Sequence, residues 1–384
     1  RPNTSGPAAM LDIRVASTTV SGLELRSFAA MNFPYGVRVT SPNVTLTSMT
    51  VDDNMGLITQ AGIALDSETT VSYASVTVNA ANTYAILSSA TAWTRLTNVR
   101  MAGGGAGPNP LFYAYNASSA TLTYVLSIAS GSRDAASFHS ASSFTVSRAT
   151  FSTANGFTAL RLSTVTASTF TDIVLFNATG DKGVYFDPYT SGVLIDRGSV
   201  TASPTTGFSG ADIRGRNIVI SNTRFNMSDL GYGIDLSGQD ITLSSVTLDA
   251  VSGGMIVSAS TRLAIANSDL RTGSGHALRL NNTAGHSIID STMTTGSVGA
   301  AAALYLQNAS SNTLERVNLY HTGSAGYGLY FDAASSNTVT DAFVSVNAGI
   351  AGVYYGAASS NVVRGLRATN YSGNAVGLDS FSRG

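Results

Sequence analysis

The charged side chains that could do chemistry in this chain are few, and several recur at similar intervals in its middle. Only 11% of the residues are charged, yet Asp187, Asp212 and Asp235 follow one another at intervals of 25 and 23 residues. Two carboxyl groups held about 5 Å apart can act as acid and nucleophile in glycoside hydrolysis, and their mutual repulsion raises one of the two pKa values. Together with the nearby Tyr185 and Arg214, these residues form our candidate catalytic set.

The same residues also have a plainer interpretation as surface charges. Opposite charges on adjacent strands neutralise each other at under about 1 kcal/mol per pair. A shift of one residue in the alignment would move every one of these side chains to the opposite face of its strand. Both interpretations therefore remain open on the sequence alone.

Tyrosines recur at one position near the C-terminal end. Tyr305, Tyr330 and Tyr354 are separated by 25 and 24 residues. Stacked in a row, their rings would bind the apolar faces of sugars or pack on one another as cross-strand pairs do. Three more side chains fall on the same face when the repeats are aligned and complete the predicted carbohydrate-binding set: Arg161, Arg279 and His139.

These intervals come from a repeat that covers nearly the whole chain. Its clearest copies begin at Ala303, Gly328 and Gly352, and each ends its first half in Ala-Ser-Ser-Asn. Apolar and polar residues alternate within every copy, a pattern typical of β-strands. The stretch 103–110 is the main irregular loop.

The repeat predicts a coil of strands. No copy contains an apolar stripe with the helical period, so the crossover between parallel strands cannot be a helix. We therefore predict an all-β fold, a single right-handed parallel β-helix of about 15 coils with about 24 residues per coil. Asn312, Asn337 and Asn361 share one turn position and are predicted to form an asparagine ladder.

The repeat also predicts how the chain is organised. It runs through residues 1–384, so we expect one continuous solenoid. Because the sequence begins and ends within residues that have the pattern of β-strands, we expect it to be a segment of a longer protein. Open parallel edges would accept further coils or partner chains.

Composition argues against several classes of protein. The net charge is −1 and the basic residues are scattered, which leaves no basic patch for a nucleic acid. Cysteine is absent and the four histidines show no metal-ligand spacing, so we expect neither a metal ion nor another cofactor. No apolar run approaches the roughly 18 residues that a membrane span needs.

In architecture the chain resembles the pectate-lyase-like right-handed β-helix proteins, in particular the long parallel β-helix repeat segments of bacterial surface and secreted proteins. That family contains polysaccharide lyases, hydrolases, uronate epimerases, phage tailspikes and non-catalytic adhesins, so the resemblance alone does not choose a function.

One short segment carries a narrower resemblance. Tyr185-Phe-Asp-Pro-Tyr is similar to the Tyr-Gly-x-Asp-Pro-His segment of the mannuronan epimerases, which implies catalytic roles for Tyr185 and Asp187. Phe186 and Tyr189 depart from that pattern. A similar Leu-Tyr-Phe-Asp follows Gly328, which favours drift of the repeat as the origin of the segment.

The regularity of the repeat favours a structural or adhesive segment of a large exported cell-surface protein or fibre, with a polysaccharide or cell-surface glycan as its binding partner. The alternative is a carbohydrate-active enzyme acting through the catalytic set on the outer face, as a polysaccharide hydrolase, lyase or epimerase or a tailspike-like depolymerase. Both hypotheses place the protein outside the cell or on its surface.

Overall fold

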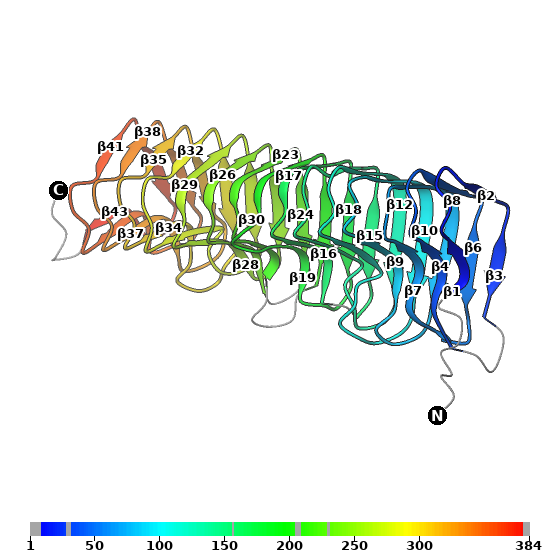
Figure 1. The fold of residues 1–384 in the computed structure, drawn as a ribbon. Coiled ribbons are helices and arrows are strands. Elements are labelled where there is room, and N and C mark those ends of the chain that lie inside the picture. Colours follow the sequence, from blue (N-terminus) through cyan, green and yellow to red (C-terminus); the bar gives the residue numbers. More distant parts are fainter. Residues whose placement is uncertain (1–8, 28–31, 156, 204–208, 229–230, 379–384) are drawn as a thin grey trace, which may run out of the picture. The chain divides into compact units, whose positions relative to one another are not determined.

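The computed structural model describes residues 9–27, 32–155, 157–203, 209–228 and 231–378. In these ranges all helical or extended secondary structure consists of β-strands, with no helix among them. The strands form a right-handed parallel β-solenoid of about 14 turns with roughly 25 residues per turn (Figure 1). The predicted fold class is confirmed.

The chain divides into two compact units, Arg1–Gly198 (unit 1) and Ser199–Gly384 (unit 2). Each unit has the same internal plan. The expectation of a single uninterrupted solenoid over residues 1–384 stays a prediction.

One strand of each coil belongs to the first sheet, sheet A, in which neighbouring strands are parallel. In unit 1 its strands pair in the order β1 (Ala9–Ile13), β4 (Phe33–Val39), β7 (Ile58–Leu65), β9 (Tyr84–Ser89), β11 (Phe112–Tyr115), β13 (Ala136–His139), β16 (Thr158–Ser163) and β19 (Lys182–Phe186). In unit 2 the order is β22 (Ser209–Ile213), β25 (Tyr232–Leu236), β28 (Gly253–Ser258), β31 (Leu278–Asn281), β34 (Ala302–Gln307), β37 (Tyr327–Asp332), β40 (Ala351–Gly356) and β43 (Asn374–Leu378).

The rest of each coil belongs to sheet B, which has a first and a second segment on either side of a corner. The unit 1 strands are β2 (Thr19–Ser21), β3 (Glu24–Arg26), β5 (Val44–Thr47), β6 (Thr50–Asp53), β8 (Thr69–Val78), β10 (Thr94–Gly103), β12 (Ala120–Ala129), β14 (Thr145–Ser147), β15 (Thr150–Thr153), β17 (Thr166–Thr171), β18 (Val174–Asn177) and β20 (Ser191–Asp196). The strands β8, β10 and β12 continue through the corner and supply both segments.

Unit 2 repeats this arrangement. Its sheet B strands are β21 (Ser199–Ala202), β23 (Arg216–Ser221), β24 (Arg224–Met227), β26 (Gln239–Ser244), β27 (Thr247–Ala250), β29 (Thr261–Ala266), β30 (Asp269–Thr272), β32 (Ser287–Ile289), β33 (Thr292–Thr295), β35 (Thr313–Glu315), β36 (Asn318–His321), β38 (Thr338–Thr340), β39 (Phe343–Val346), β41 (Val362–Arg364) and β42 (Arg367–Asn370).

The core consists of inward side chains that align from coil to coil. Val37 pairs in register with Ile63, and Ile63 with Ile86, and all three are fully buried. Met255 and Leu278 continue the same kind of ladder in unit 2. Because strand residues alternate between the two faces, the inward ladder leaves every second residue of sheet A on the outer face.

The corner of sheet B requires a left-handed backbone conformation. In three successive coils of unit 2 it is occupied by Asn267, Asp290 and Arg316, each with φ close to 50°. Asn and Asp tolerate this conformation better than most residues. The Arg316 guanidinium binds both carboxylate oxygens of Asp290, at 2.6 and 2.9 Å, and so ties two neighbouring coils together.

A second turn of unit 2 is held by amide side chains. The Asn337 Oδ1 accepts from the backbone N–H of Asn312 at 3.0 Å, and the Asn361 Oδ1 accepts from the backbone N–H of Asn337 at 3.0 Å. The Asn312 Oδ1 in turn accepts from the backbone N–H of His286 at 2.9 Å. Asn312 and Asn337 are almost fully buried, so these bonds satisfy backbone donors that water cannot reach.

Candidate functional site

The outer face of sheet A in unit 2 has the register that the sequence repeat predicted. Asp212 pairs with Asp235, Arg279 with Tyr305, Tyr305 with Tyr330 and Tyr330 with Tyr354. These paired residues form one column that runs across the strands. One residue of β28 separates its acidic part, Asp212 and Asp235, from its aromatic part. The two parts have different surroundings.

The aromatic part is a packed row of tyrosines. The rings of Tyr305 and Tyr330 stack with centroids 4.9 Å apart, and those of Tyr330 and Tyr354 meet edge to face at 5.2 Å. The Tyr327 ring lies against two rings of the row, with its centroid 4.7 Å from that of Tyr330 and 5.1 Å from that of Tyr354. Tyr327, Tyr330 and Tyr354 are half-buried, so part of each ring faces solvent.

Tyr305 is the covered member of the row. It is only 9% exposed, and His276 stacks against its ring with centroids 4.5 Å apart. Its hydroxyl donates to the Asp332 carboxylate at 2.5 Å. Burial and this hydrogen bond both raise the pKa of Tyr305, so the phenol stays protonated and holds Asp332 in place.

Polar groups frame the aromatic row. The Arg279 guanidinium lies over the Tyr305 ring, 5.5 Å from its centroid, and donates to the Gln307 Oε1. The Arg279 Nε is buried, and no hydrogen-bond partner for it is found among the residues that the structure describes. The His276 Nδ1 accepts from the backbone N–H of Ala302 at 3.0 Å. Burial and the charge of Arg279 lower the pKa of His276 to about 4, so this imidazole is neutral at neutral pH.

We call this surface the aromatic face. It consists of His276, Arg279, Tyr305, Gln307, Tyr327, Tyr330, Asp332 and Tyr354.

Sequence reasoning missed His276 and Tyr327 as members of the aromatic face. Strand alternation would turn Tyr327 inward, because it is three residues from Tyr330 on the same strand. His276 lies in the turn before β31, where no strand period applies. The only available signal was that each immediately precedes a copy of the repeat.

The acidic part of the column is partly neutralised. The Arg214 guanidinium binds the two carboxylate oxygens of Asp212 at 2.8 Å each, and Asp212 is only 2% exposed. Asp235 lies beside Asp212 on the next strand and is half-buried. The bidentate ion pair gives Asp212 a structural partner, as the plainer interpretation expects.

In unit 1, Asp187 has a structural role. It is 8% exposed, and its carboxylate accepts from the Ser163 hydroxyl at 2.8 Å, the Thr164 N–H at 3.0 Å and the Thr190 N–H at 2.8 Å. Burial works to raise the pKa of Asp187, but these hydrogen bonds outweigh it and lower the pKa. The carboxylate therefore holds the turn after β19 and is a poor proton donor.

Tyr185 lies between two cations. The Arg161 guanidinium and the Lys182 ammonium lie 5.1 and 5.0 Å from the centre of its ring. In register, Arg161 is the partner of Tyr185 on the neighbouring strand. Tyr185 is thus a packing partner of two basic side chains.

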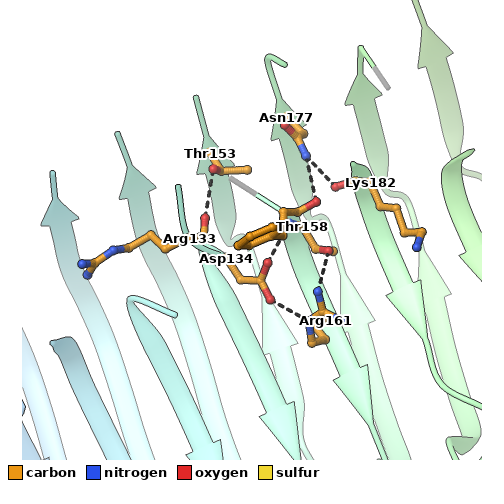
Figure 2. A network of polar contacts seen from close by, with 8 residues as sticks. Arg133, Asp134, Thr153, Thr158, Arg161, Asn177 and Lys182 are labelled. Atoms are coloured by element: carbon orange, nitrogen blue, oxygen red, sulfur yellow. Dashed lines mark hydrogen bonds and ion pairs between the residues drawn. The ribbon is translucent and has the colours of Figure 1, made fainter. Parts of the chain in front are cut away.

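Arg161 is in turn held by Asp134, a residue that the sequence did not single out (Figure 2). The Arg161 Nε donates to one Asp134 oxygen at 2.6 Å, and the other oxygen accepts from the Thr158 N–H at 2.7 Å. Burial raises the pKa of the Asp134 carboxyl, against the effect of Arg161. The ion pair fixes the direction of Arg161 along the outer face.

His139 belongs to a second row of rings in unit 1. It stacks on Tyr115 at 5.5 Å, and Tyr115 contacts Tyr113 at 6.0 Å. Tyr113 stacks almost in parallel on Tyr84, with centroids 5.3 Å apart and planes at 9°. The alignment missed these tyrosines because the repeat is irregular around residues 103–110.

The described residues contain no group of three His, Asp or Glu side chains that could hold a metal ion. In the same part of the chain, no helix is long and apolar enough to cross a membrane.

Comparison with known proteins agrees with the fold. Residues 232–383 match the family model described as the right handed beta helix region. No curated protein matches the chain. The family match covers less than half of the chain, and the described strands have the right-handed parallel β-helix fold.

Several solved structures are similar to this chain at low sequence identity. A tailspike protein mutant of Escherichia coli bacteriophage HK620, in complex with pentasaccharide, is 10% identical, with 95% of this chain and 73% of that chain covered and a TM-score of 0.48. The A-module of the Azotobacter vinelandii mannuronan C-5 epimerase AlgE6 is 10% identical, with 82% and 90% covered and a TM-score of 0.39. The periplasmic alginate epimerase AlgG is 8% identical, with 86% and 77% covered and a TM-score of 0.39. At these identities the likeness is one of fold alone.

Proposed function

We propose that this chain is a glycan-binding β-helix segment of an exported cell-surface protein or fibre, and that the aromatic face of unit 2 binds the sugar. The observation that carries the proposal is the row of half-buried rings, Tyr327, Tyr330 and Tyr354, beside the polar groups of Arg279 and Gln307. An extracellular location is part of the proposal. Similar folds in a periplasmic epimerase and a phage tailspike are compatible with it.

The chemistry of the face suits a polysaccharide. The apolar side of a pyranose packs on an aromatic ring, and tyrosine rings offer large contact areas at a low cost in side-chain entropy. The Arg279 guanidinium lies over the Tyr305 ring and donates to the Gln307 Oε1, so hydrogen-bond donors border the rings. Hydroxyl or carboxylate groups of a glycan would accept those hydrogen bonds.

Binding is favoured over catalysis by the state of the acidic residues. The carboxylate of Asp187 is saturated by donors, and that of Asp212 is engaged by Arg214. A proton donor or nucleophile must be free to reach its substrate. The aromatic face needs no such freedom, because a pre-formed surface binds a rigid ligand at lower entropic cost.

The test is a glycan screen with the whole chain, followed by calorimetry with the best soluble oligosaccharide. Tyr330→Ala and Tyr354→Ala should each weaken binding about tenfold, since one aromatic contact contributes about 0.5–1.5 kcal/mol beyond its buried area. Tyr371→Ala is the matched control, because Tyr371 is 78% exposed and is not a member of the aromatic face. A blank screen, or equal losses in all three variants, would refute the proposal.

A carbohydrate-active enzyme is the second candidate. It is favoured by one observation, the pairing of Asp212 with Asp235 on adjacent strands, which are about 4.8 Å apart. That separation is close to the spacing of the two carboxyl groups in retaining glycosidases. Arg214 would then position Asp212 and orient its charge.

A further inference from the structure

The outer face of sheet B in unit 1 carries a regular array of hydroxyl groups, which neither hypothesis above uses. The first segments of seven successive coils contribute two outward positions each. The first column is Thr19, Thr45, Thr70, Arg95, Thr121, Thr145 and Thr169, and the second is Ser21, Thr47, Ser72, Thr97, Thr123, Ser147 and Thr171. All but Arg95 are serine or threonine, and we call this set the hydroxyl array.

The array is a two-dimensional lattice. The strands that carry it pair residue for residue without a register shift. Neighbouring strands are about 4.8 Å apart, and two positions along one strand are separated by about 6.6 Å. In six of the seven coils a fully buried apolar anchor lies between the two array residues, such as Val71, Leu96 or Leu122, and in the first coil Val20 is half-buried. Because the core beneath is close-packed, the lattice is rigid.

Most hydroxyls of the array are available to a ligand. The Ser72 hydroxyl donates to Thr47 at 3.1 Å, and those of Thr123 and Ser147 are 3.3 Å apart. The other threonine hydroxyls of the array have no hydrogen-bond partner in the described part of the chain. The exposed Arg95 is the one charged side chain within it. The surface therefore offers hydroxyl and methyl groups at fixed intervals and almost no charge.

We propose that the hydroxyl array binds ice. A soluble sugar would engage only one or two positions, whereas a ligand that uses all seven coils must itself be periodic in two dimensions. The two spacings of the array are close to the repeats of water oxygens on a prism face of hexagonal ice. Hydroxyls can join that hydrogen-bonded lattice while threonine methyl groups fill the spaces between its water molecules.

A crystalline polysaccharide is the other periodic ligand, and the composition of the array does not favour it. The flat face of such a crystal presents apolar C–H groups, for which aromatic rings are the suitable partners. No aromatic side chain belongs to the array. The exposed Tyr73 and Tyr124 lie only at its border, at the corner of sheet B.

The experiment measures inhibition of ice recrystallisation and thermal hysteresis by the whole chain. Thr121→Lys and Thr123→Lys place a long charged side chain in the lattice and should lower activity at least tenfold. Thr150→Lys is the matched control, because Thr150 is a half-buried outward residue of β15 outside the array. Arg95→Thr completes the first column and should raise activity at least twofold.

Circular dichroism melts identify any variant that fails to fold, and the Arg95→Thr gain does not depend on a damaging substitution. Wild-type protein without effect on ice, an equal loss in the Thr150→Lys control, or pull-down by crystalline cellulose in place of ice would overturn the proposal. The array and the aromatic face lie on different sheets, so Thr121→Lys should leave glycan binding unchanged. Failure of one proposal is thus distinguishable from failure of the other.

Discussion

Acidification should destabilise unit 2 through His286, and the hydrogen bonds of this residue explain why. His286 is 1% exposed, and its Nδ1 accepts from the backbone N–H of Leu263 at 3.1 Å. The Thr283 hydroxyl donates to the Ser260 carbonyl at 2.7 Å, so its oxygen accepts from the His286 Nε2–H at 2.5 Å. The imidazole is therefore neutral with its proton on Nε2. A second proton would bind at Nδ1, where its N–H would point at the backbone N–H of Leu263 and repel it.

The magnitude follows from linkage between protonation and folding. Burial lowers the pKa of His286 from its ordinary value of 6.5 to about 4. Below pH 6.5 His286 binds a proton in the unfolded chain but not in the folded protein. The free energy of unfolding therefore falls with falling pH until the pKa of the folded state is reached. Between pH 7 and pH 5 the free energy of unfolding should drop by about 2 kcal/mol from this residue.

The assay is urea unfolding of wild-type protein and His286→Asn at both pH values. Asparagine occupies the corresponding turn position in the next coils, where its Oδ1 accepts a backbone N–H as the His286 Nδ1 does. The variant should lose about 2 kcal/mol less than wild-type protein on acidification. His276 remains in both proteins, so its own contribution cancels. An identical loss in both proteins would refute the reasoning.

Two further predictions test the strand phase and the second candidate function. Val339→Asp and Ile241→Asp each place a charge without a partner in the fully buried ladder and should lower stability by more than about 3 kcal/mol; unchanged thermal melts would contradict the assigned phase. If a glycan screen reveals turnover, Asp212→Asn combined with Asp235→Asn should abolish it. Undiminished turnover in that double variant would remove both residues from the mechanism.

The period of the repeat was sufficient to predict which outer side chains become neighbours. Asp212 beside Asp235 and Tyr305 beside Tyr330 both follow from a coil of about two dozen residues, because register decides contacts in a stacked solenoid. Residues outside strands could not be placed in this way. His276 reaches the aromatic face from a turn, where alternation gives no direction to the side chain.

The repeat pattern alone predicts the all-β coil, its repeat length and the columns of the outer face, because alternation and period act locally and recur along the whole chain. The contacts of each of those residues, in contrast, follow only from the folded arrangement. Asp187 is saturated by hydrogen bonds from the preceding coil and its own turn, and Tyr305 is covered by His276. Burial and hydrogen bonding depend on groups brought together by folding, and those groups decide whether a carboxylate or a ring is free to act.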